Sequence, residues 1–281
     1  MDGTSKPDRR ARRLHLAALL TVLVLVAAIA PGAAAYGATP GGRPESVKPT
    51  IVLVHGAWAD SSSWSDVVRR LQSHGYTVDV PPNPLRGLAG DSAYLASFLA
   101  TISGPVVLVG HSYGGAVITD AATGAPNVKA LVYINAFAPD QGESVLQLVG
   151  VQPGSALAAD PAQVFNVVPF ATDADLYIQP GLFPGAFAND LSPRQAAVLA
   201  TTQRPLAASA SSEQSGPPAW KTIPAWYLVG TADHVLPPAE QAVMASRMHA
   251  HTVSVDASHL SMISQPGQVT KLIIDAAKSV R

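Results

Sequence analysis

The fold is decided by the stretch Val106-Val107-Leu108-Val109-Gly110-His111-Ser112-Tyr113-Gly114-Gly115. Its four leading apolar residues predict a buried parallel strand. The next five match the pattern G-x-S-x-G, in which a sharp turn from strand to helix presents a serine hydroxyl. Such a turn strains the backbone of Ser112 and leaves no room for a Cβ at Gly110 or Gly114. The helix expected over residues 113–123 points its positive end at this serine.

Composition excludes one class of function. The chain has 281 residues, a net charge of −1 and no cysteine. Nucleic-acid binding needs a basic face, and no basic cluster occurs outside the N-terminus, so we expect no nucleic-acid partner. Without cysteine there is no disulfide framework and no thiolate zinc site.

The N-terminus has the pattern of a secretory signal peptide over residues 1–35. Arginines at positions 9, 10, 12 and 13 precede an apolar run over 14–30, and Ala33-Ala34-Ala35 supplies a small-residue cleavage site. We expect cleavage after Ala35, a secreted or extracytoplasmic product and no membrane association afterwards. An uncleaved membrane anchor is the alternative, and Arg12-Arg13 also permits a twin-arginine route. Residues 36–48 are rich in Gly and Pro and predict a flexible linker.

Strands and helices alternate through the expected main domain, residues 49–281. Strands are predicted over Thr50–Val54, Thr77–Val80, Val106–Val109, Ala130–Ile134, Ala225–Val229 and Thr252–Val255. Helices are predicted over Ser63–Ser73, Asp91–Ile102, Pro238–Met248 and Gln265–Lys278. This alternation is typical of an α/β fold, with a mostly parallel sheet of about six strands and helices on both faces. The carboxyl ends of such strands share one edge, where ligands bind.

The segment from about 139 to 222 interrupts the alternation. It has many Pro and Gly residues, no clear strand pattern and a helical piece at Pro193–Thr202. A segment this long is seldom a plain loop in a compact domain. We therefore expect a small helical cap inserted over the edge of the sheet.

Two further strand ends carry the partners that a nucleophilic serine needs. A serine hydroxyl requires a base, and the base requires an orienting acid. Asp233 follows the strand ending at Val229, and His259 follows the strand ending at Val255, in the order serine, acid, histidine. We predict Ser112, Asp233 and His259 as the catalytic residues. Asp140 and Glu143 are rival acids, and Asp233 is also compatible with a simple turn.

A tetrahedral oxyanion needs two backbone N–H donors. One is predicted at Tyr113, the residue after the nucleophile. The other is predicted at Ala57, in the loop after the first strand, with Trp58 as the near alternative. Gly56 lets this loop approach the serine, and His55 is expected to brace the loop and not to act as a base.

Four motifs together resemble the α/β-hydrolase superfamily. They are His55–Trp58, Gly110–Gly115, Gly230–Asp233 and Ser258–Pro266. The similarity is greatest to the branch of plant methylesterases, hydroxynitrile lyases and related bacterial esterases. This resemblance implies an α/β-hydrolase fold, a small cap, a buried apolar pocket, no cofactor and ester hydrolysis through an acyl-enzyme. No set of histidines and carboxylates has metal-ligand spacing, so we expect no metal.

One position departs from the lyases of that branch. They carry a lysine directly after the catalytic histidine, whereas this chain has Leu260. The sequence therefore favours a secreted serine hydrolase, a carboxylesterase acting on small to medium apolar esters as its small-molecule partner. The predicted pocket walls include Trp58, Leu260, Phe183 and Phe187. The alternatives are a cofactor-free haloperoxidase or perhydrolase, a C–C or amide hydrolase, and a ligand-binding homologue without turnover.

Overall fold

A computed structural model describes residues 48–280. The predicted signal peptide lies outside the described residues, and so does the predicted linker except for its last residue, Lys48.

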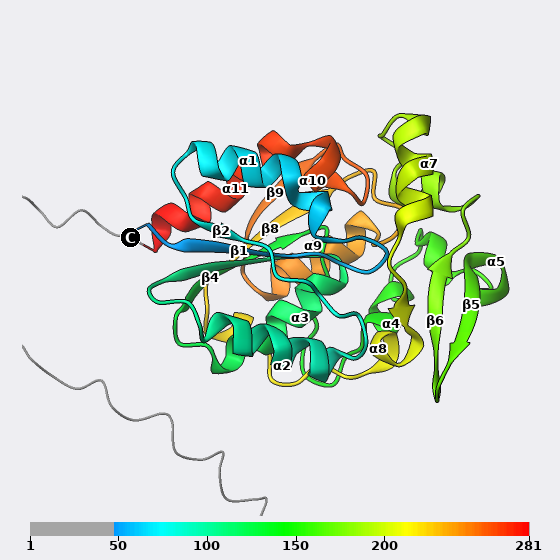
Figure 1. Cartoon of the computed structure of the whole chain (residues 1–281), viewed down its shortest axis with the longest axis horizontal. Coiled ribbons are helices and arrows are strands. Elements are labelled where there is room, and N and C mark those ends of the chain that lie inside the picture. The colour runs from blue at the N-terminus through cyan, green and yellow to red at the C-terminus, as the bar shows by residue number, and fades with distance from the viewer. Residues whose placement is uncertain (1–47, 281) are drawn as a thin grey trace, which may run out of the picture. The chain divides into compact units, whose positions relative to one another are not determined.

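Six parallel strands form the central sheet, in the order β2-β1-β3-β4-β8-β9 (Figure 1). Their bounds are β1 Thr50–Val54, β2 Val78–Asp79, β3 Val106–His111, β4 Val128–Ile134, β8 Ala225–Gly230 and β9 His251–Val255. The predicted parallel sheet is confirmed. The inner strands are almost wholly buried and are rich in Val, Leu and Ile, as expected of strands covered on both faces. Strand-end residues pair across the sheet, for example Val54 with Gly110 and Gly230 with Val255.

Helices cover both faces of this sheet. Helices α1 (Ser65–Ser73) and α11 (Pro266–Ser279) lie on one face, and α2 (Leu88–Leu99) and α3 (Tyr113–Ala121) lie on the other (Figure 1). Helix α9 (Pro238–Arg247) packs beside β8. The shorter pieces are η1 Ser61–Trp64, η2 Ala122–Gly124 and α10 Ser261–Ser264. None of the helices within residues 48–280 combines the length and apolar character needed to cross a bilayer.

Helix α11 illustrates why these segments are helical. Its buried apolar residues recur at helical spacing, at Val269, Leu272, Ile273 and Ala276. That spacing places all four on one stripe facing the sheet. Pro266 occupies the first turn, where its missing N–H costs no hydrogen bond.

The cap begins beyond β4 and lies past the carboxyl ends of the strands (Figure 1). Helix α7 (Pro193–Thr202) has the predicted bounds. The other helical pieces are α4 Val145–Val149, η3 Ala156–Ala158, α5 Pro161–Val164, α6 Phe183–Phe187, α8 Ala208–Ser212 and η4 Ala219–Lys221. The prediction of a small helical cap with no clear strand was wrong about the strands. The cap also holds an antiparallel sheet of β5 (Phe165–Phe170), β6 (Asp173–Ile178) and β7 (Leu206–Ala207).

The cap strands were missed because their local signals are weak. The hairpin turn between β5 and β6 is Ala171-Thr172, which lacks the Asn-Gly or Asp-Gly pair typical of such turns. Pro169 also interrupts the first run. A proline is tolerated there because β5 is an edge strand, so its missing N–H breaks no ladder hydrogen bond on the open side.

Candidate active site

Ser112 occupies the turn between β3 and α3. Its backbone has φ 51° and ψ −126°, a left-handed conformation that costs a non-glycine residue about 1–3 kcal/mol. A Cβ at Gly110 would lie 2.6 Å from the Gly114 carbonyl oxygen, and one at Gly114 would lie 2.7 Å from the Val54 carbonyl oxygen. The predicted strain and the predicted need for both glycines agree with this geometry.

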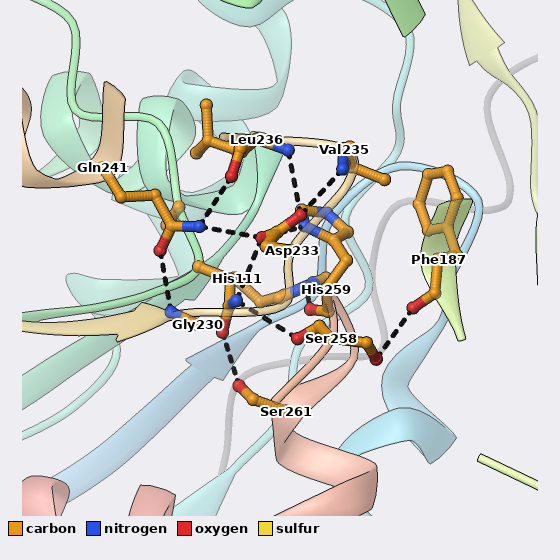
Figure 2. Close-up of polar contacts among 12 residues, drawn as sticks. His111, Phe187, Gly230, Asp233, Val235, Leu236, Gln241, Ser258, His259 and Ser261 are labelled. Carbon is orange, nitrogen blue, oxygen red and sulfur yellow. Dashed lines mark hydrogen bonds and ion pairs between the residues drawn. The ribbon is translucent and has the colours of Figure 1, made fainter. Parts of the chain in front are cut away.

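Asp233 and His259 form a buried pair. Nδ1 of His259 lies 2.8 Å from Oδ2 of Asp233, and neither side chain is exposed (Figure 2). Oδ1 of Asp233 accepts from the backbone N–H groups of Val235 and Leu236, at 2.8 and 2.9 Å. Because the carboxylate accepts the Nδ1 proton, Nε2 of His259 carries the free lone pair. That Nε2 atom is buried and has no partner among the described residues.

The rival acids lie elsewhere and have other partners. Oδ1 of Asp140 lies 2.5 Å from Nζ of Lys221, and this hydrogen bond holds the pKa of Asp140 below its usual value. Glu143 pairs with Arg247 at 2.6 Å. The structure therefore brings Asp233, and neither rival, to the imidazole of His259.

Asn135 also holds the carboxylate of Asp233, and the sequence reasoning missed this role. Its Nδ2 donates to Oδ2 of Asp233 at 3.0 Å and to the Ser258 carbonyl at 3.2 Å. Its Oδ1 accepts from the Ser261 hydroxyl at 2.5 Å. Asn135 directly follows β4, so its position at the carboxyl edge was a signal that could have identified it.

Gln241 is the second residue that the sequence reasoning missed. Its Nε2 donates to Oδ2 of Asp233 at 2.9 Å and to the Leu236 carbonyl at 2.7 Å, and its Oε1 accepts from the Gly230 N–H at 3.1 Å (Figure 2). It lies within α9, where nothing in the local pattern marks it. With Asn135 and His259 it gives Oδ2 of Asp233 three donors, as a buried carboxylate requires.

Two buried histidines brace the site. The ring of His111 lies 4.8 Å from that of His259, and its Nε2–H donates to the His259 carbonyl at 2.9 Å. Burial holds the pKa of His111 well below its usual value. Nε2 of His55 accepts from the Asn83 N–H at 3.1 Å, and burial lowers the pKa of His55 as well. This agrees with the expectation that His55 braces its loop.

The loop after β1 packs directly on the serine. A Cβ at Gly56 would lie 2.6 Å from the Ser112 Cβ, so only glycine fits there. Within residues 48–280, the amides of Ala57 and Tyr113 donate to no backbone acceptor. The Trp58 amide donates to the Arg204 carbonyl at 2.9 Å and is already occupied. Of the two candidates in this loop, Ala57 therefore has the available N–H.

An apolar cavity lies over the serine. Its walls are mostly aliphatic and aromatic and include Phe137, Val145, Val149, Leu157, Phe165, Leu206 and Val235. Among residues 48–280, no charged side chain lines it. The indole N–H of Trp58 and the hydroxyls of Tyr113 and Ser211 each donate to other parts of the protein. Among the described residues that line this cavity, Ser112 thus has the polar side chain without a hydrogen-bond partner. Within residues 48–280, no three His, Asp or Glu residues are grouped as a metal ion would require.

A family model described as the alpha/beta hydrolase family matches residues 51–272. The chain belongs to this family. Together with the six-stranded sheet, the match confirms the predicted fold and the resemblance.

Curated relatives of this α/β hydrolase include two esterases. It is 37% identical over 112 residues to a carbendazim hydrolyzing esterase from Nocardioides sp., covering 35% of this chain and 46% of the relative. It is 25% identical over 252 residues to putative methylesterase 13 of Arabidopsis thaliana, covering 81% of this chain and 56% of the relative. The matches span about half the length of these two relatives.

A solved structure has a similar fold. It is titled an extracellular alpha/beta-hydrolase from a Paenibacillus species that shares structural and functional homology to tobacco salicylic acid binding protein 2. The TM-score is 0.66 and the identity is 21%, over 81% of this chain and 98% of the other.

The predicted pocket residues of this α/β hydrolase divide between two places. Trp58 lines the cavity above Ser112. Leu260 and Phe183 line a neighbouring hollow, which Trp58 also borders. The Phe187 ring lies edge-on to the His259 imidazole, with 5.1 Å between ring centroids, and so contacts that ring directly.

Proposed function

We propose that this α/β hydrolase is a serine carboxylesterase that cleaves small to medium apolar esters through an acyl-enzyme. One observation carries the proposal. Ser112 presents an unpartnered hydroxyl, in a strained turn, to an apolar cavity, while His259 is held by Asp233 with Nε2 unpartnered. The esterase names of two curated relatives agree with it.

The first half of the proposed reaction forms the acyl-enzyme. Oγ of Ser112 attacks the ester carbonyl carbon, and its proton passes to Nε2 of His259. Asp233 stabilises the imidazolium that results. The tetrahedral intermediate then collapses, the bond to the alcohol oxygen breaks, and the alcohol leaves with the proton from His259. The transfer requires Oγ and Nε2 to approach to about 2.6–3.2 Å when substrate is bound.

Water completes the proposed cycle. His259 removes a proton from water as the water oxygen attacks the acyl carbon. The tetrahedral intermediate collapses, the bond between that carbon and Oγ breaks, and His259 returns the proton to Oγ, which releases the carboxylic acid and the free Ser112 hydroxyl. In both halves the amides of Ala57 and Tyr113 stabilise the oxyanion. Their freedom from backbone acceptors supports this role.

The lining of the cavity supports an uncharged substrate. In the part of the chain that the structure describes, no Lys, Arg, Asp or Glu side chain lines the space above Ser112. Placing a charged acyl group there would require its desolvation without a compensating partner. We therefore propose that short aliphatic and aromatic esters are hydrolysed. Monoesters of dicarboxylic acids, whose acyl group carries a free carboxylate, should be poor substrates.

A serine-directed fluorophosphonate tests this proposal. The probe should label Ser112, and the wild type should hydrolyse p-nitrophenyl acetate and butyrate. Ser112→Ala should abolish both signals, whereas Ser254→Ala, on strand β9, should retain them. If Ser112→Ala is still labelled and still turns over these esters, the assignment of the nucleophile is wrong.

We also propose that the enzyme is exported. The sequence pattern over residues 1–35 is the support for this proposal. Expression of the full chain in a secreting host should yield a processed protein beginning at Tyr36, as determined by N-terminal sequencing. Recovery of the full-length chain in the membrane fraction would instead identify an uncleaved anchor.

A further inference from the structure

Trp58, the residue after the proposed oxyanion donor Ala57, has an unusual backbone. Its φ is 57°, the left-handed region that bulky side chains rarely adopt. Such a conformation costs about 1–3 kcal/mol and persists only where the surroundings impose it. The residue is 7% exposed, so those surroundings are protein.

The cap supplies the contacts that hold Trp58. The indole Nε1–H donates to the Leu176 carbonyl in β6 at 2.7 Å, and the backbone N–H donates to the Arg204 carbonyl at 2.9 Å. The ring stacks on Phe165 of β5, with centroids 5.9 Å apart, and meets Phe187 of α6 edge-on at 5.5 Å. Four separate segments of the cap therefore contact one residue of the loop after β1, residues 55–58, which we call the oxyanion loop.

The other end of this loop is held by the main domain. Asn83 donates twice to His55, from its backbone N–H to Nε2 at 3.1 Å and from its Nδ2 to the carbonyl at 2.9 Å, and Gly56 packs against the Cβ of Ser112. Ala57 lies between these two attachments. The direction of its N–H therefore depends on both.

We propose that Trp58 is a positioning residue through which the docked cap sets the Ala57 amide for the oxyanion. The inference rests on the proposed esterase function and adds a role for the cap in the chemical step. Trp58 acts through Ala57, and the hydrogen bond of its indole N–H is the contact that keeps the Ala57 amide in position. If Trp58 were merely a pocket wall, its ring would matter and its N–H would not.

An isosteric replacement separates the two roles. Incorporating 3-benzothienylalanine at position 58 replaces the indole N–H with sulfur and preserves the bicyclic ring, whereas Trp58→Phe removes the N–H and also makes the ring smaller. Trp220→Phe is the matched control. Its buried indole N–H also donates to a carbonyl, that of Pro139 at 3.0 Å, away from the oxyanion loop. Circular dichroism and thermal melting verify that all three proteins fold.

Kinetics and inhibitor binding provide the first readout. Complete removal of an oxyanion donor lowers kcat about 10²- to 10³-fold. In the benzothienyl protein the Ala57 N–H is misplaced and not removed, so kcat should fall about 10- to 100-fold, with KM changed less than about twofold. Affinity for an aryl trifluoromethyl ketone, whose adduct places an oxyanion at the donors, should fall by the same factor. Affinity for the matching methyl ketone should not change. Trp220→Phe should alter none of these values.

Hydrogen–deuterium exchange provides a readout that does not depend on turnover. The Trp58 backbone N–H, bonded to Arg204, should exchange faster in the benzothienyl protein and remain protected in Trp220→Phe. Unchanged exchange, or a change confined to KM, overturns the inference. A wild type that neither hydrolyses esters nor labels Ser112 refutes the proposed function instead, and exchange alone then decides whether the cap holds the loop.

Discussion

Gly230 and Asn135 approach so closely that a Cβ at Gly230 would lie 2.1 Å from Nδ2 of Asn135. That Nδ2 is the atom that donates to Asp233. Gly230 ends β8, and Asn135 follows the neighbouring strand β4. The absence of a side chain at residue 230 is therefore what allows an amide to reach the carboxylate of the next loop.

Gly230→Ala should lower both the free energy of unfolding and kcat. The new methyl group must displace Asn135 or the Ala257 carbonyl, which would lie 2.9 Å from it. Overpacking of this kind costs about 1–3 kcal/mol. Urea unfolding should show this loss, and kcat should fall because Asp233 loses a donor. Gly267→Ala is the control, since its Cβ meets nothing within 4 Å at a helical position, and its stability should be equal or higher. Equal stability of both variants would contradict the prediction.

Asp233→Asn tests which carboxylate orients His259, the proposed base. An amide cannot compensate the positive charge that develops on His259, and it favours the wrong tautomer. We expect kcat to fall on the order of 10⁴-fold with KM little changed. Asp140→Asn, at the rival acid, should retain activity because Asp140 pairs with Lys221. The opposite result in steady-state kinetics would move the acid to Asp140.

Acidification should destabilise the fold through His111. Burial keeps its pKa well below the ordinary value of 6.5, so below about pH 6.5 the unfolded chain binds a proton that the folded protein does not. The free energy of unfolding must then fall as the pH falls, by up to about 1.4 kcal/mol per pH unit for this group.

Replacing this imidazole should flatten that dependence. His111→Gln keeps a donor near the His259 carbonyl and removes the titrating group. Its stability in urea should fall less steeply than that of the wild type between about pH 6.5 and pH 5. His74→Gln, at an exposed ring, should keep the wild-type slope. Parallel curves for wild type and His111→Gln would refute the assignment.

Asp190 connects the cap to the loop that carries His259. Its Oδ2 accepts from the Ser258 N–H at 2.9 Å, and its Oδ1 accepts from the Ser258 hydroxyl. Asp190→Ala should lower kcat about tenfold, because a misplaced catalytic group is costly. Asp160→Ala is the matched control, since Asp160 also lies in the cap but its side chain accepts from the Ala162 N–H at the start of helix α5. That variant should cost about 1 kcal/mol of stability and leave kcat unchanged. Equal kcat values for the two variants would show that Asp190 has no positioning role.

Much of the fold could be predicted because its signals are local. Apolar runs such as Thr50–Val54 match the strand bounds, and Pro193–Thr202 matches a helix. The glycines around Ser112 could be interpreted because a strained turn with close packing accepts no other residue. The cap sheet could not be predicted, because β5 is largely exposed, its hairpin turn has no Asn-Gly signal, and β6 pairs with β7 far along the chain, Asp175 with Ala207.

The role of Gln241 and the positions of Phe183 and Leu260 could not be predicted for the same reason. Gln241 is one polar position on a helix, and only the packing of α9 beside β8 directs it to Asp233. Phe183 and Leu260 are apolar residues near the site, yet packing places them in the neighbouring hollow and not above Ser112.

The sequence by itself determined the order of strands and helices around the main sheet, the turn at Ser112 and the candidates Asp233 and His259. It could do so because periodicity, glycine requirements and the shared edge of parallel strands all act over short stretches. The tertiary structure decided which carboxylate meets His259, which amides remain free and how the cap holds Trp58. Those outcomes depend on hydrogen bonds between residues from 26 to 146 positions apart, and no local pattern encodes them.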